Sequence, residues 1–201
     1  MAEKYTDKQC ILAIDQGTSG TKTLVINQLG KVLAKGLVAL QSHYLEGGKV
    51  EKDPEAIFQN VLQAVNSCLQ VYQAGGYSLG NILTCGISNQ RETFLIWDQA
   101  GHPISNAIVW QCKRSIGICK KLKSKGLEPL IREKTGLIID PYFSGTKLIW
   151  LYENDPKIKK AINEGKAYFG TVDSWLLFRL SKREKYLTDF TNASRTLFFN
   201  L

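Results

Sequence analysis

A short loop near the amino terminus combines glycines, hydroxyl groups, a carboxylate and a cation. It reads Asp-Gln-Gly-Thr-Ser-Gly-Thr-Lys over residues 15–22, and its glycines, Gly17 and Gly20, are three residues apart. Glycine lets a backbone approach a ligand closely, and backbone N–H groups with neighbouring hydroxyls can cradle an oxyanion. A Walker P-loop has four residues between its glycines and leads into a helix, so this is not that motif. The loop indicates either a phosphate site or an ordinary hairpin turn.

Two charged side chains flank this loop. Asp15 ends an apolar run, where its carboxylate could hold Mg²⁺ directly or through water. Lys22 adds a positive charge on the other side, which favours a bound phosphate.

A second polar cluster follows an apolar segment in the middle of the chain. Residues 88–93 read Ser-Asn-Gln-Arg-Glu-Thr and come directly after the run Ile-Leu-Thr-Cys-Gly-Ile. Ligands of α/β sheets bind at the carboxyl ends of strands. Arg91 beside Glu92 offers donors and acceptors together, which suits the adjacent hydroxyls of a small polyol. The alternative is a structural ion pair, and Trp110 likewise fits either an apolar wall beside a carbon skeleton or core packing.

The composition limits the classes of protein. The chain has 201 residues, of which 44% are hydrophobic and 22% charged, and this excludes disordered and collagen-like chains. Its length predicts one domain, or one and a half. No apolar run approaches the roughly 20 residues of a membrane span. The polar amino terminus carries no apolar signal core, so we expect a cytoplasmic protein.

The cysteines and the basic residues point to no special site. The five cysteines are odd in number and widely spaced, which predicts free thiols, no disulfide and no zinc site. Residues 113–134 carry a net charge of +6 within an overall charge of +8. A solvated helix face explains this run better than a nucleic-acid surface, because no aromatic residue interleaves with its lysines.

The order of predicted elements is specific. Strands are expected at 10–15, 21–27 and 31–40, and their short links require an antiparallel meander. A helix is predicted from Pro54, capped by Asp53 and ended by the glycine pair 75–76. Further strands are predicted at 82–88 (a buried one), 93–97, 107–110, 186–188 and 196–199, and further helices at 112–125, 127–135, 143–154, 157–164 and 171–180.

Three antiparallel strands, a helix and a fourth strand do not make a doubly wound Rossmann sheet, which alternates strand and helix from its start. The order fits an α/β fold with a mixed sheet flanked by helices, the ribonuclease-H-like core of actin-type ATPases and sugar kinases.

Six motifs in register give the chain a family resemblance. It resembles the FGGY carbohydrate kinase family from Ile11 to Asn200. The motifs are DQGTSGTK (15–22), NQRET (89–93), AIVWQCKR (107–114), TGLIIDPYFSGTK (135–147), FGTVDSWL (169–176) and TDFTNASRT (188–196).

The resemblance implies an activity and a polyol site. Members of this family transfer the γ-phosphate of ATP to a polyol or sugar hydroxyl, here a terminal hydroxyl of glycerol. By matching motifs, Arg91 and Glu92 hold the hydroxyls of the polyol, Tyr142 is a third contact and Trp110 is the apolar wall.

The resemblance also implies a nucleotide site. Thr18, Ser19, Gly20 and Lys22 match the loop that binds the ATP phosphates, and Asp15 lies near Mg²⁺. The chain departs from the glycerol-phosphorylating branch here, where a Thr-Ser-Ser-Arg-like run is usual, and instead resembles xylulose-type kinases. A kinase for another polyol or sugar therefore stays open, as does a non-catalytic polyol-binding module.

Members of the family are more than twice as long as this chain. The resemblance implies that residues 1–201 are part of an amino-terminal kinase domain, and that the catalytic aspartate base lies beyond Leu201. We therefore assign no catalytic residue here. We expect the chain alone to be inactive, and the full-length protein to be a homo-oligomer that binds no nucleic acid.

Overall fold

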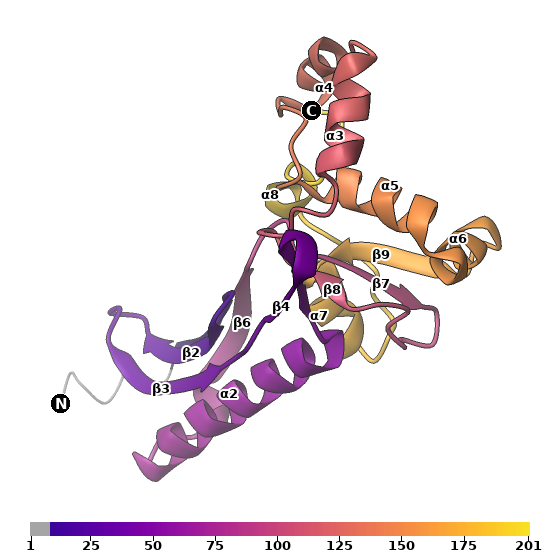
Figure 1. Ribbon diagram of the computed structural model, residues 1–201. Helices are drawn as coiled ribbons and strands as arrows, with labels where there is room; N and C mark the ends of the chain where they lie inside the picture. The colour runs from indigo at the N-terminus through magenta and orange to yellow at the C-terminus, as the bar shows by residue number, and fades with distance from the viewer. Residues whose placement is uncertain (1–8) are drawn as a thin grey trace. The chain divides into compact units, whose positions relative to one another are not determined.

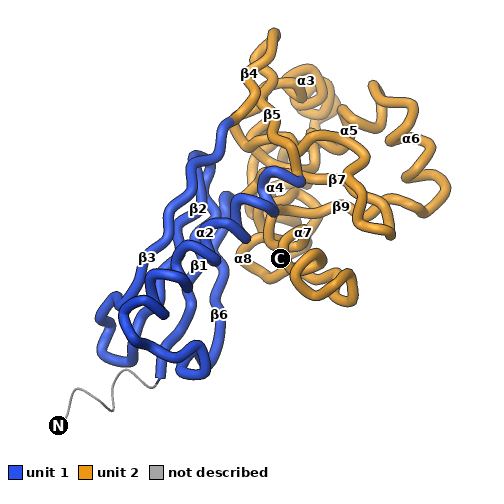
Figure 2. Tube along the Cα trace, turned by 90° about the horizontal axis from the view of Figure 1, so that it is seen from below, with its two compact units in different colours: residues 1–41, 55–90 blue, residues 42–54, 91–201 orange. Residues whose placement is uncertain are grey.

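The structure, a computed structural model, describes residues 9–201 (Figure 1). Most of the polar amino-terminal segment, from which the sequence predicts a cytoplasmic protein, lies outside the described residues. The chain forms two compact units, shown in Figure 2. Unit 1 combines the residues up to 41 with 55–90, and unit 2 combines 42–54 with 91–201. Among the described helices, none has the length and apolar character needed to cross a membrane.

Unit 1 is built on a four-stranded mixed sheet with the order β3-β2-β1-β6. Its strands are β1 (Cys10–Gln16), β2 (Gly20–Asn27), β3 (Val32–Ala39) and β6 (Ile82–Asn89). β1 pairs antiparallel with β2, and β2 antiparallel with β3, so the predicted meander is confirmed. β6 pairs parallel to β1. A short 3-10 turn, η2 (Leu79–Asn81), leads into β6.

Helix α2 (Pro54–Ala74) covers one face of this sheet, beginning at Pro54 as predicted. The Thr23 hydroxyl on β2 donates to the Ala64 carbonyl at 2.7 Å, and the Asn60 amide donates to the Ala39 carbonyl at 2.9 Å. A Cβ at Gly36 would lie 2.2 Å from the same Ala64 oxygen, so only glycine permits this close approach of helix and strand.

The predicted burial of β6 is wrong. This strand is exposed along most of its length, and Leu83 is 65% exposed. Within the described residues β6 ends the sheet and pairs only with β1. An apolar run is typical of a strand covered on both faces, but the covering depends on neighbours that the run itself does not specify.

Unit 2 is built on a five-stranded antiparallel sheet with the order β4-β5-β8-β7-β9. Its strands are β4 (His43–Leu45), β5 (Lys49–Lys52), β7 (Phe94–Asp98), β8 (Ala107–Ile108) and β9 (Ala167–Thr171). A 3-10 turn, η1 (Glu46–Gly48), joins β4 to β5. The sequence predicts β7 and β8 but not β4, β5 or β9.

Six helices belong to unit 2. Five of them lie close to predicted positions, and one is unpredicted. They are α3 (Ile116–Ser124), α4 (Glu128–Thr135), α5 (Ser144–Asn154), α6 (Pro156–Asn163), α7 (Val172–Leu180) and the short, unpredicted α8 (Phe190–Ala193).

Both faces of β7 are buried. Phe94 and Ile96 pack in one cluster with Leu151 of α5 and Ile158 of α6. The ring of Trp97 contacts the rings of Trp175 and Phe178 on α7, with centroids 5.4 and 5.9 Å apart. Neighbouring residues of a strand point to opposite faces, so helices lie on both sides of this sheet.

The predicted strands at 186–188 and 196–199 are wrong. Tyr186 is held by its side chain and not by strand pairing. Its ring stacks on the ring of Tyr168 with centroids 4.5 Å apart, and its hydroxyl donates to the Phe169 carbonyl. In the second segment Leu197 has a φ of 65°, and the Phe198 N–H donates to the Thr196 hydroxyl at 3.1 Å. A left-handed residue breaks an extended strand.

The lysine-rich run lies on exposed positions of α3 and α4. Lys121 pairs with Glu153 at 3.3 Å, and Lys123 pairs with Glu128 at 3.1 Å. These exposed pairs accord with a solvated helix face. All five cysteines carry free thiols, and four of them are buried.

Candidate functional site

The glycine-rich loop is a tight hairpin between β1 and β2. The Gly17 N–H donates to the Gly20 carbonyl at 2.8 Å, and the Leu40 N–H donates to the Ser19 carbonyl at 2.9 Å. A Cβ at Gly20 would lie 2.4 Å from the Val38 carbonyl oxygen, a backbone atom that cannot easily move. The loop therefore needs glycine at this position, and the predicted residues Thr18, Ser19 and Gly20 share one turn.

Glutamine side chains fix this hairpin within unit 1. The Gln90 amide donates to the Gln16 side-chain oxygen at 3.0 Å, and the Gln90 N–H donates to the Gln16 carbonyl at 2.7 Å. The Gln16 amide donates in turn to the Gly17 carbonyl at 2.9 Å. Gln90 follows β6, so the end of that strand is tied to the base of the loop.

Asp15 and Lys22 lie opposite one another across the β1–β2 ladder. Directly opposed residues of an antiparallel pair share a face of the sheet. Both side chains are exposed, and they line an open hollow of about 320 Å³ together with Ser88 and apolar residues of β1, β2 and β6. The carboxylate and the cation that the sequence singles out are therefore neighbours.

The hairpin fits a phosphate and a magnesium ion better than a protein-only metal cage. Among residues 9–201 no three histidine, cysteine or acidic side chains are grouped as metal ligands. Mg²⁺ is commonly held by one or two carboxylates together with substrate phosphates, which the single carboxylate of Asp15 suits. The hydroxyls of Thr18 and Ser19 and the cation of Lys22 flank the turn, and such groups can bind an oxyanion.

The second candidate cluster lies in unit 2 and is centred on Glu92. This residue is only 2% exposed and has a φ of 64°, a left-handed conformation that is uncommon outside glycine. Its carboxylate accepts a hydrogen bond from Arg195 Nε at 2.7 Å. Arg195 is therefore the ion-pair partner that the structure gives Glu92, and the neighbouring Arg91 is exposed.

The predicted aromatic residues join this cluster. The rings of Trp110 and Tyr142 meet edge to face with centroids 5.5 Å apart, and the Trp110 N–H donates to the Thr93 hydroxyl at 3.4 Å. The Arg195 guanidinium lies 5.9 Å from the centre of the Tyr142 ring. Arg195 thus contacts both Glu92 and Tyr142, and Trp110 joins the cluster through Tyr142. We call these four residues, with Arg91, the polyol corner.

Two short turns position the polyol corner. The Asp140 carboxylate accepts from the Tyr142 N–H at 2.8 Å, which fixes the backbone just before α5. The Asp189 carboxylate caps α8 by accepting from the Asn192 N–H at 2.8 Å, and α8 leads directly to Arg195. Burial opposes ionisation of Asp189, but hydrogen bonds from Asn192 and Thr191 outweigh it and lower the pKa of this carboxyl.

Three residues in contact with Glu92 are absent from the sequence-based candidates. Arg195 binds its carboxylate, while the Ser144 hydroxyl and Lys147 Nζ donate to its carbonyl at 3.2 and 3.4 Å. Ser144 and Lys147 lie in the motif SGTK, and Arg195 lies in NASRT. The basic and hydroxyl side chains within these motifs are the signal that could have identified all three as site residues.

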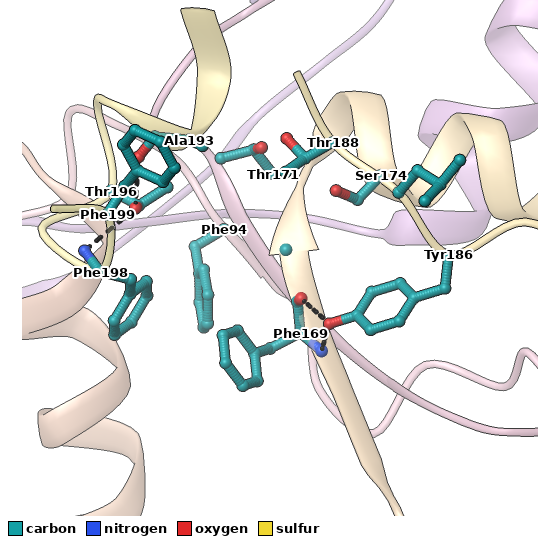
Figure 3. A pocket seen from close by; sticks show the side chains of 12 residues that line it. Phe94, Phe169, Thr171, Ser174, Tyr186, Thr188, Ala193, Thr196, Phe198 and Phe199 are labelled. Carbon is teal, nitrogen blue, oxygen red and sulfur yellow. Dashed lines mark hydrogen bonds between the residues drawn. The ribbon is translucent and has the colours of Figure 1, made fainter. Parts of the chain in front are cut away.

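A separate apolar pocket of about 330 Å³ lies in unit 2 near the end of the chain (Figure 3). Figure 3 shows the rings of Phe94, Phe169 and Phe198 turned toward it, with Tyr186 hydrogen-bonded to the backbone of Phe169. None of the predicted site residues lines it.

Comparison with known proteins gives one consistent family. Residues 10–201 match the N-terminal domain of the FGGY family of carbohydrate kinases. The chain is 45% identical to glycerol kinase 1 of Thermotoga maritima over 192 residues and 43% identical to the glycerol kinase of Shewanella amazonensis over 196 residues.

Solved structures agree with these sequences. A glycerol kinase of Plasmodium falciparum crystallised with ADP superposes with a TM-score of 0.91 at 36% identity, over 96% of this chain and 38% of that chain. A xylulose kinase of Lactobacillus acidophilus superposes with a TM-score of 0.81 at 26% identity, over 96% of this chain and 37% of that one. These similarities confirm the fold that the strand order predicts.

The chain covers only part of its relatives. It aligns over 95% and 97% of its own length with the Thermotoga and Shewanella proteins, but over only 38% and 39% of theirs.

Proposed function

The chain belongs to the FGGY family of carbohydrate kinases, and from that premise we propose that the full-length protein is an ATP-dependent glycerol kinase. It would transfer the γ-phosphoryl group of ATP to glycerol and release glycerol 3-phosphate and ADP. The observation that carries the proposal is the polyol corner of unit 2, in which the buried Glu92 carboxylate pairs with Arg195, whose guanidinium lies near Tyr142, and Tyr142 contacts Trp110. The 43–45% identity to glycerol kinases supports the same substrate.

In this proposal each residue of the corner has a distinct role toward glycerol. The Glu92 carboxylate accepts hydrogen bonds from hydroxyls of the polyol, and Arg91 donates to their oxygens. The Tyr142 hydroxyl is a third polar contact. The Trp110 ring, held edge to face against Tyr142, is the apolar wall beside the carbon skeleton.

The hairpin of unit 1 is proposed to bind the nucleotide phosphates. Backbone N–H groups of the turn, the hydroxyls of Thr18 and Ser19, and the cation of Lys22 would contact phosphate oxygens around Gly20. Asp15 would hold Mg²⁺, which neutralises charge on the phosphates when it is bound. The ADP in the Plasmodium falciparum structure supports ATP as the phosphoryl donor.

A kinase for another sugar is the second candidate, and one observation favours it. The run Ser19-Gly20-Thr21-Lys22 has lysine where an arginine would provide a bidentate fork. The xylulose kinase has the same fold, so the fold does not separate the two substrates. The Arg91–Glu92 pair and the higher identity to glycerol kinases favour glycerol.

The proposal also includes a cytoplasmic location and self-association of the full-length protein. Five free thiols accord with a reducing compartment. Sedimentation of the full-length protein tests the self-association.

The test of the function is a coupled ADP-release assay with the full-length protein. Glycerol, xylulose and gluconate are compared at equal concentrations with ATP and Mg²⁺. We expect the highest kcat/KM for glycerol. A higher kcat/KM for xylulose or gluconate would make the second candidate correct, and no turnover of any of the three would reject the kinase assignment.

A further inference from the structure

We propose that Lys147 of α5 is a positioning residue of the polyol corner, which it organises by binding the peptide carbonyls of Glu92 and Tyr142 together. The inference rests on the proposed function, because it assigns Lys147 a role toward the polyol that these two residues contact. Lys147 itself does not reach the substrate in this scheme.

The contacts of Lys147 are backbone contacts. Its side chain is fully buried, at 0% exposure, and Nζ donates to the Tyr142 carbonyl at 2.8 Å and to the Glu92 carbonyl at 3.4 Å. Glu92 lies 55 residues before Lys147 in the chain. One ammonium group therefore joins two segments that each supply a polyol contact.

Glu92 needs such a constraint. Its φ of 64° is unfavourable for a residue with a long side chain, and conformations of this kind persist only where the surroundings over-determine them. The Ser144 hydroxyl, in the first turn of the same helix, donates to the Glu92 carbonyl at 3.2 Å. Lys147 and Ser144 together fix the peptide that aims the Glu92 carboxylate.

The charge of Lys147 is poorly compensated for a core position. The groups that interact with it electrostatically are Glu92, Cys112, Arg114 and Asp140, of which Arg114 repels the charge. Burial lowers the pKa of Lys147 to about 7. An apolar side chain of similar length would fill the space without this penalty, so packing alone does not account for a lysine here.

The alternative is a structural lysine whose only role is to satisfy buried carbonyls. Steady-state kinetics separate the two roles. Loss of a structural group lowers stability and the fraction of active enzyme, whereas loss of a positioning group raises the KM for one substrate alone.

The experiment compares Lys147→Met and Ser144→Ala in the full-length protein. Lys157→Met, at an exposed position of α6, is the matched control. Thermal unfolding, kcat, and the KM values for glycerol and ATP are measured for each. Because a small misplacement of a binding group can cost up to about 100-fold, we expect Lys147→Met to raise the glycerol KM between about 10- and 100-fold. Ser144→Ala raises it several-fold, while the ATP KM of both variants and all values of Lys157→Met stay near those of the wild type.

An unchanged glycerol KM in Lys147→Met, with a lower melting temperature, would overturn the inference and leave a structural lysine. If Lys147→Met does not fold, Ser144→Ala decides, because Ser144 donates to the same carbonyl, and an unchanged KM there also overturns it. Failure of the proposed function gives a different result. Wild-type turnover of xylulose rather than glycerol rejects only the substrate, and the same variants are then compared on xylulose. No turnover of either polyol rejects both.

Discussion

Unit 1 covers one face of its sheet and leaves the other open, whereas unit 2 covers both faces of β7 with helices. In unit 1, α2 packs on the side of Thr23, and Ile11 on the opposite side is 45% exposed. In unit 2, Phe94 and Trp97 are buried on opposite faces of β7. The two candidate clusters follow the same division, because Asp15 and Lys22 are exposed and Glu92 is buried.

The two clusters are held in place by different kinds of contact. The hairpin owes its geometry to backbone hydrogen bonds, to neutral amide side chains at its base, and to Gly20, where a Cβ would clash with β3. The polyol corner owes its geometry to charged side chains that bind one another and buried carbonyls. Single side-chain substitutions should therefore damage the polyol corner more than the hairpin.

The largest effect is expected when residues 1–201, which contain both clusters, are separated from the rest of the full-length protein. Residues 1–201 alone should show no measurable glycerol-dependent ADP release, because we expect from the family resemblance that the aspartate base lies outside this segment. General base catalysis alone is worth about 10²–10⁴ in rate. Glycerol-dependent turnover by the purified segment, close to that of the full-length protein, would show that the base lies within it.

Arg195→Ala should have the next largest effect. It removes the partner of a buried carboxylate, and an unsatisfied buried group costs about 1–3 kcal/mol, so the unfolding free energy should fall by about that amount. We also expect the glycerol KM to rise about 10- to 150-fold, since the hydrogen bond that holds the Glu92 carboxylate goes to a charged group and is worth about 1.5–3 kcal/mol. Urea unfolding and steady-state kinetics measure both quantities. Wild-type stability in this variant would mean that Glu92 is held without the ion pair.

Lys147→Met should change how stability depends on pH. The pKa of Lys147 is about 7 in the folded protein and 10.5 in an unfolded chain. Between these values the unfolded chain binds the extra proton, so this group makes the unfolding free energy rise with pH, by at most about 1.4 kcal/mol per pH unit. Below pH 7 the penalty for burying the charge is fully present.

The variant lacks this titration. The stability of the wild type minus that of Lys147→Met should therefore increase between pH 6 and pH 9.5, as measured by thermal unfolding. A difference that stays constant across this range would contradict the depressed pKa.

Lys22→Ala should have the smallest effect. Lys22 is exposed on the open face, where substitutions usually change stability by less than about 0.5 kcal/mol. The ATP KM should rise only a few-fold, because backbone N–H groups of the turn remain. A loss of stability as large as that of Arg195→Ala would remove the distinction between the two clusters.

The sequence predicts the local elements of unit 1 well. The meander of β1, β2 and β3 follows from β-branched runs joined by short links, and α2 from its cap and the spacing of its apolar residues. These signals are local, so the structure reproduces them closely. The short strands β4, β5 and β9 carry no such signal, because they exist only through pairing with distant partners.

The candidate sites divide in the same way. The motifs identify Arg91, Glu92, Tyr142 and Trp110, whose residue types suit a polyol. They do not identify the contact of Arg195 with Glu92, which joins residues 103 positions apart. The hydrogen bond from Lys147 to the Glu92 carbonyl likewise cannot be predicted from the residues around Lys147, because its acceptor is a backbone atom of another segment.

The most direct test of the account is the Kd for glycerol, measured by calorimetry without nucleotide in full-length Arg91→Ala and Lys22→Ala. If polyol recognition belongs to the polyol corner of unit 2, the Arg91→Ala Kd rises about 10- to 150-fold, the loss of one hydrogen bond to a charged group. The Lys22→Ala Kd stays at the wild-type value. The account would be contradicted if the glycerol Kd of Arg91→Ala equals that of the wild type, or if the Kd rises only in Lys22→Ala.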